Sequence, residues 1–117
     1  MSIRRLLYAA VVCAAAPAAS RADVPLPTGG SLPAVDFERH VMGLLSKVGC
    51  NGGSCHGSFQ GKNGFRLSLF GYQPEFDFAA LTRDNLGRRV NLVHPEDSLI
   101  LTKGTGALAH DGGMRIG

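Results

Sequence analysis

The sequence has no tryptophan, only two tyrosines and a charged fraction of only 18%. Its 16 glycines leave few apolar side chains for a core, which is already hard to build in a small domain. Such a chain would gain stability from a large apolar group bound at its centre. The sequence also shows no Ser-His-Asp order, no phosphate-binding loop and no paired carboxylates, so we expect a carrier or binding module and not an enzyme.

A long apolar run is also missing. The N-terminus opens with the basic stretch MSIRR, continues with an apolar stretch at Leu6–Ala19 and ends in SRA, which has the small-x-small form of a cleavage site. The apolar stretch is shorter than the ~20 residues of a membrane span, and Pro17 interrupts it. Residues 1–22 are therefore predicted to be the signal peptide of an exported protein, periplasmic or at the cell surface, without a stable membrane span.

An excess of charge is missing from the predicted mature chain. The whole sequence contains 12 basic and 9 acidic residues. Cleavage after Ala22 removes Arg4, Arg5 and Arg21 and no acid, so the basic and acidic residues that remain are equal in number. A neutral chain gives no reason to expect a nucleic-acid partner.

The most informative motif is GCNGGSCHG at residues 49–57, in which His56 directly follows the second of two cysteines, Cys50 and Cys55. Covalent haem attachment typically uses C-x-x-C-H, because two thiols add to the haem vinyl groups and the adjoining histidine binds iron. Here the spacer is wider, and its two glycines can adopt the backbone angles of a wider loop. The sequence therefore predicts one covalent haem c, attached at Cys50 and Cys55, with His56 as the proximal iron ligand.

Two alternatives stay open at this motif. Cys13 leaves with the signal peptide, and the two remaining thiols can form a disulfide in an oxidising compartment, although a disulfide gives His56 no role. A zinc site needs four ligands, and the motif supplies three of them. The fourth would be one of the other histidines, His40, His94 or His110.

The predicted elements are short and are separated by glycine-rich loops. Residues 23–34 are rich in proline and glycine and are predicted to form an extended lead-in. The best helix runs from Asp36, a favoured N-cap residue, to Gly49, a natural stop, with one apolar stripe. Alternation at residues 65–69 predicts a short strand-like or extended loop segment. Two further helices, each opening with proline followed by acids, are predicted at residues 74–83 and 95–103.

The loop after the last predicted helix offers two candidates for the sixth iron ligand. Met114 would give Met/His ligation and a raised reduction potential, whereas His110 would give bis-histidine ligation and a lower one. His40 is expected on the surface of the first helix. His94, directly before Pro95, is expected only to begin a helix.

Residues from about Val35 to Gly117 resemble the cytochrome-c-like domain found near the N-terminus of large exported planctomycete-type proteins. The resemblance rests on GCNGGSCHG with the same long spacer, and on GKNGFRLSLFGY, LTRDNLGRR, PEDSLILTK and AHDGGMR. It implies thioether bonds at Cys50 and Cys55 and iron bound by His56, and the position of His110 matches a family histidine. It also implies electron transfer to a redox partner protein or to a neighbouring domain of the full-length chain.

The expected fold is mostly α, a small cytochrome-c-like helical domain around haem at residues 35–117, with glycine-rich loops. A cytochrome c closes with a C-terminal helix, and only three residues follow Met114, so we expect an incomplete C-terminus. Arg88 and Arg89 are predicted to lie in a surface patch, with haem propionates as the alternative. The expected function is a c-type haem-binding electron-transfer module. The competing function is a disulfide-stapled, non-haem binding or adhesion module of a cell-surface protein.

Overall fold

The computed structural model describes residues 22–117 and divides the chain into two compact units, with the boundary between Ala34 and Val35. Apart from Ala22, the predicted signal peptide, with its Cys13, lies outside the described residues.

The described part of the first unit is a small β-hairpin. Strand β1 (Val24–Pro25) pairs antiparallel with strand β2 (Ser31–Leu32). Gly29 and Gly30 form the turn with φ values of +88° and +81°, a conformation that favours glycine. The predicted extended lead-in thus contains two paired strands, which its proline and glycine content did not indicate.

The second unit begins with the helix that was predicted to start at Asp36. The Asp36 carboxylate accepts a 2.7 Å hydrogen bond from the backbone N–H of Arg39, which confirms the predicted N-cap. The first turns form a π-helix at Phe37–Met42, and helix α1 (Gly43–Lys47) continues it. Gly49, with a φ of +82°, follows the last turn as predicted.

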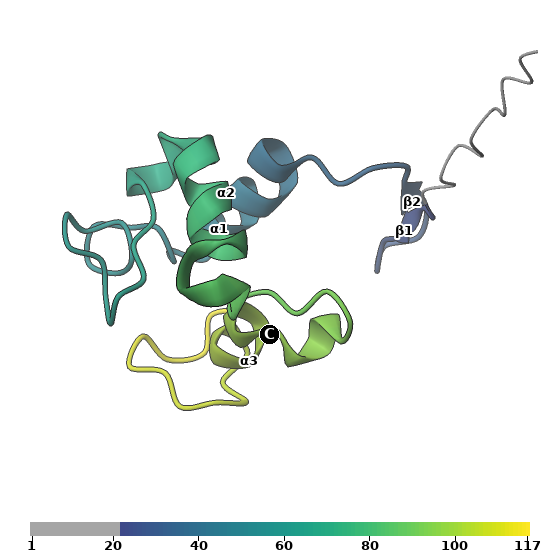
Figure 1. The fold of residues 1–117 in the computed structure, drawn as a ribbon. Coiled ribbons are helices and arrows are strands. Elements are labelled where there is room, and N and C mark those ends of the chain that lie inside the picture. The colour runs from purple at the N-terminus through teal and green to yellow at the C-terminus, as the bar shows by residue number, and fades with distance from the viewer. Residues whose placement is uncertain (1–21) are drawn as a thin grey trace, which may run out of the picture. The chain divides into compact units, whose positions relative to one another are not determined.

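Helix α2 (Pro74–Thr82) packs against the π-helical stretch (Figure 1). The rings of Phe37 and Phe78 meet edge to face, with centres 5.1 Å apart. Helix α3 (Leu99–Gly104) is shorter than predicted, because the proline and acids before it form a separate 3-10 turn. The 3-10 turns of this unit are Leu69–Gly71, Asp84–Gly87 and Pro95–Asp97.

Of the two forms predicted for residues 65–69, the extended loop is confirmed and the strand is not formed. Within the described chain, this segment forms one isolated bridge, between Phe65 and Lys62. The N–H of Leu67 donates instead to the carbonyl of His56, at 2.8 Å. The segment is extended because it pairs with the loop that follows the cysteines, and not because it belongs to a sheet.

The expected mostly α, cytochrome-c-like fold is also wrong. Helical residues of all types make up about 38% of the chain that the structure describes, and the three α-helices are five, nine and six residues long. Glycine is the physical reason, because nine of the 16 glycines have φ values between +68° and +88°, a conformation that ends helices and forms turns. None of the helices in residues 22–117 has the length and apolar character needed to cross a membrane.

The hydrophobic core of the second unit is small. Its buried members are Met42, Leu45, Cys50, Leu67, Ala80 and Leu81. Leu45 comes from α1, and Ala80 and Leu81 come from α2. The packing of these two helices therefore anchors Cys50, the first cysteine of the motif.

A buried carboxylate joins α2 to the extended segment. Asp77 is fully buried, and its two oxygens accept hydrogen bonds from the backbone N–H and the hydroxyl of Ser68, both at 2.6 Å. The Ser68 hydroxyl in turn accepts from the backbone N–H of Gln73, at 2.9 Å, directly before α2. These bonds satisfy polar groups that water does not reach.

Replacing Asp77 with alanine is expected to lower the free energy of unfolding by about 2–4 kcal/mol, because the buried donors of Ser68 lose their acceptor. Glu75→Ala removes an exposed carboxylate from the same helical turn. This substitution should change the free energy of unfolding by less than about 0.5 kcal/mol. Urea unfolding followed by circular dichroism measures both variants. Equal effects of the two substitutions would contradict the role assigned to Asp77.

Candidate functional site

The loop between the two cysteines is closed by its own backbone. The N–H of His56 donates to the carbonyl of Cys50 at 3.0 Å, and the N–H groups of Cys55 and Gly57 both donate to the carbonyl of Gly52, at 3.0 and 3.1 Å. Cys50 is buried, Cys55 is half-buried, and both are free thiols. Burial raises the pKa of the Cys50 thiol, and the neighbouring Cys55 raises it further. The loop places two free thiols beside His56.

His56 is held on both its backbone and its ring. Its carbonyl accepts the hydrogen bond from Leu67, and its ring Nδ1 lies 3.0 Å from the carbonyl of Phe65. A carbonyl only accepts, so Nδ1 carries the proton and Nε2 keeps its lone pair in the neutral ring. Burial lowers the pKa of His56, with a smaller opposing effect from the bond to Phe65. The ring is therefore held neutral with Nε2 available to bind a metal.

His110 comes from the C-terminal loop and has the same arrangement. Its Nδ1 donates to the carbonyl of Gly113 at 2.9 Å. A Cβ on Gly112 would lie 2.9 Å from the His110 ring, so the glycine makes room for the imidazole. The ring planes of His56 and His110 are parallel to within 2°, and their centres are 6.2 Å apart. Two loops far apart in the sequence thus present two matched imidazoles.

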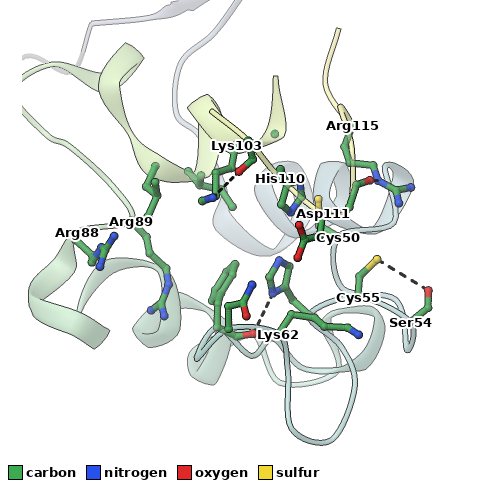
Figure 2. Close-up of a pocket in the computed structure, with 18 residues that line it drawn as sticks. Cys50, Ser54, Cys55, Lys62, Arg88, Arg89, Lys103, His110, Asp111 and Arg115 are labelled. Atoms are coloured by element: carbon green, nitrogen blue, oxygen red, sulfur yellow. Dashed lines mark hydrogen bonds between the residues drawn. The ribbon is translucent and has the colours of Figure 1, made fainter. Parts of the chain in front are cut away.

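A cavity of about 560 Å³ contains both histidines and both cysteines (Figure 2). Its size falls within the roughly 300–1,000 Å³ of small-molecule and cofactor sites. Apolar lining comes from Phe65, Leu99 and Ile100, and charged lining comes from Lys62, Arg88, Arg89, Lys103, Asp111 and Arg115. Cations outnumber the single carboxylate, so the cavity favours a ligand with an apolar body and negative groups.

Arg89 corrects the prediction of a surface patch. Its side chain is only 6% exposed, and its Nη1 and Nη2 donate to the carbonyls of Ala80 and Gly64 at 2.6 and 2.9 Å. Its guanidinium lies over the ring of Phe65, 4.4 Å from the centre. Burial lowers the pKa of Arg89. Arg88 is exposed as predicted, and it too lines the cavity.

The other predicted ligands lie elsewhere. Met114 is 69% exposed and is not among the residues that line the cavity. The Nδ1 of His40 accepts a 2.9 Å hydrogen bond from the backbone N–H of Asp36, so His40 belongs to the start of the first helix. His94 is exposed and lies 3.7 Å from Glu96. Of the candidates for the sixth iron ligand, the structure brings His110 to the cysteine motif.

A ready-made zinc site is not found around the motif. Zinc requires four ligands close enough to share one ion. In the part of the chain that the structure describes, the one group of three or more ligating side chains within 4.8 Å of one another is the exposed cluster of His94, Glu96 and Asp97. The two cysteines, His56 and His110 share a cavity, but no three of them converge this closely.

Sequence patterns pointed to the cysteine motif and to His110, but not to the groups that hold the rings in place. The acceptors are backbone carbonyls, which carry no side-chain signal.

Comparisons with models of protein families, with curated proteins and with solved structures gave no match to this chain.

A close backbone contact inside the motif can be tested by adding one methyl group. A Cβ on Gly57 would overlap the carbonyl of Asn51, so Gly57→Ala is expected to force the cysteine loop open and to cost about 2–4 kcal/mol of folding free energy. Gly43→Ala is the control, because nothing lies within 4 Å of that position in α1 and alanine favours a helix. Thermal unfolding measures both variants, and a neutral Gly57→Ala would contradict the packing of the loop.

Proposed function

We propose that this chain is a c-type haem-binding electron-transfer module of an exported protein. The observation that carries the proposal is the parallel pair of imidazoles, His56 and His110, in one cavity with Cys50 and Cys55. The proposed haem group is covalent, one per domain, with thioether bonds at the two cysteines. The scaffold in this proposal is loop-rich and is not the helical domain that the sequence suggested.

The spacing of the two rings supports iron ligation by both. Two metal–imidazole bonds of about 2.0 Å on opposite sides of one ion place the ring centres roughly 6 Å apart. The observed separation is 6.2 Å, and each ring has its Nδ1 bonded to a backbone carbonyl, which leaves Nε2 for the ion. His56 and His110 would hold the iron of a bound haem, whereas tetrahedral zinc needs four ligands.

The cysteines fit the attachment chemistry. Each thiol adds across one haem vinyl group, so that sulfur bonds to one vinyl carbon, the thiol hydrogen goes to the other and no external oxidant is needed. Free thiols at Cys50 and Cys55 are the form that this addition requires. The alternative, a disulfide-stapled binding module, gives no role to the matched rings of His56 and His110.

Haem supplies one-electron redox chemistry when it is bound. The protein's part is to fix the two imidazoles, to exclude water from one face of the cavity with Phe65, Leu99 and Ile100, and to present positive charge around it. Bis-histidine ligation favours a lower reduction potential than Met/His ligation. The electron partner is a redox protein or a neighbouring domain of the full-length chain.

Covalent attachment is tested with protein matured in a periplasm that contains the c-type haem assembly machinery. On a denaturing gel stained for haem, the wild type is expected to retain the stain and Cys50→Ala/Cys55→Ala to lose it, because thioether bonds survive denaturation. A well-exported wild type without stain would reject the proposal and favour the disulfide-stapled module.

The iron ligands are tested by absorption and electron paramagnetic resonance spectra of the same protein. We expect a low-spin bis-histidine spectrum in the wild type, and a high-spin ferric spectrum in His110→Ala, because iron loses one axial nitrogen. Met114→Ala is the control, since this exposed side chain lies away from the cavity, and its spectrum should match the wild type. A high-spin change in Met114→Ala with an unchanged His110→Ala would reverse the assignment.

A further inference from the structure

The buried cation at Arg89 forms no ion pair in the described chain, and the charge of Asp84 raises the pKa of Arg89 only against the larger lowering by burial. Both of its hydrogen bonds go to backbone carbonyls, and the one ion pair found in residues 22–117 is between His94 and Glu96. A buried charge without an ion pair is costly, and two neutral acceptors with an acid beyond ion-pair distance compensate it only in part. Because Arg89 lines the cavity, an anion in the cavity would complete its environment.

Arg88 adds a second free cation at the same place. It is exposed, it lines the cavity, and no hydrogen bond or ion pair of its side chain occurs within the described residues. Figure 2 shows Arg88 and Arg89 at one end of the cavity, Cys50 and Cys55 at the other, and His110 between them. The two cysteines and the Arg88–Arg89 pair thus lie on the two sides of His110, and the guanidinium of Arg115 lies at the cysteine end, near Gly49.

Haem likewise carries different groups on its two opposite edges. Its two vinyl groups lie on one edge of the porphyrin, and its two propionate carboxylates project from the opposite edge. Thioether bonds at the cysteines would direct the propionates toward the arginines. Guanidinium groups suit this task, because their planar N–H groups match a carboxylate in two parallel hydrogen bonds.

We infer that Arg88 and Arg89 form the propionate-binding site of this chain and set the protonation of the haem carboxylates. This inference deepens the proposed haem function and rests on it. Asp111 is the one acid that lines the cavity, and the remaining charged groups there are Lys62, Lys103, Arg115 and the two histidines. The pair is a positioning and tuning site, and it does not touch the iron.

The test is the pH dependence of the reduction potential of the haem-loaded protein, measured by spectroelectrochemical titration. Arg88→Gln removes a cation beside one carboxylate, so the midpoint of the pH-dependent step is expected to move up by roughly one pH unit, as a carboxylate that loses a nearby cation does. Lys62→Gln is the matched control, because Lys62 is also exposed and lines the cavity but lies away from the two arginines (Figure 2). Its midpoint should stay at the wild-type pH.

Arg88→Lys and Arg89→Lys extend the test to variants that keep the charge. Each should raise the midpoint by less than Arg88→Gln does, because lysine keeps the cation but loses the paired hydrogen bonds. Wild-type midpoints in Arg88→Gln and Arg89→Lys would overturn the inference, and so would equal shifts in Arg88→Gln and Lys62→Gln. A wild type that carries no haem would instead overturn the proposed function.

Discussion

The cavity depends on the hydrogen bonds that hold the loop at His56 against the extended segment at Phe65 and Leu67. His56 accepts a hydrogen bond from Leu67 through its carbonyl and donates one to Phe65 through its ring, so the cysteine loop and the extended segment are joined twice. The first bond fixes the position of the residue, and the second fixes the ring tautomer and its plane. With His56 fixed in this way, His110 needs only one bond, to the carbonyl of Gly113, to lie parallel to it. Loop segments, and not helices or strands, thus fix the positions of the two imidazole rings.

The small core and the charged cavity both follow from the small number of large apolar side chains in the chain. The chain has few large apolar side chains, and several of them, including Phe59, Tyr72 and Leu92, lie exposed on the surface. Packing is therefore concentrated where α1 and α2 meet Leu67 and Cys50. The cavity beside this core combines an apolar wall with several cations, and such a lining gains most from a ligand that fills space and neutralises charge together.

Sequence reasoning worked where one residue type has one local task. Asp36 caps its helix and Gly49 follows its last turn, because each acts on neighbouring backbone groups. The position of the cysteine motif directly after that helix followed from the same signals. Sequence reasoning failed where the interacting residues are far apart in the sequence. Residues 65–69 alternate like a strand, but Leu67 pairs with His56 and not with a sheet. The adjacent arginines were both expected at the surface, but Arg88 is exposed and Arg89 is buried. The prediction of a mostly α fold relied too much on the short apolar stripes. It relied too little on the glycines, many of which adopt the left-handed backbone conformation.

The wide spacer between the cysteines is held by hydrogen bonds at its first residue. Asn51, its first residue, is fully buried, and its Nδ2 donates to the hydroxyl of Ser46 at 2.8 Å. Its carbonyl accepts from the N–H of Phe70 at 3.1 Å and lies directly under Gly57. The spacer is therefore anchored to helix α1 on one side and to the 3-10 turn Leu69–Gly71 on the other. The N–H groups of Cys55, His56 and Gly57 donate to the carbonyls of Gly52 and Cys50, so the rest of the loop is closed by backbone hydrogen bonds as well.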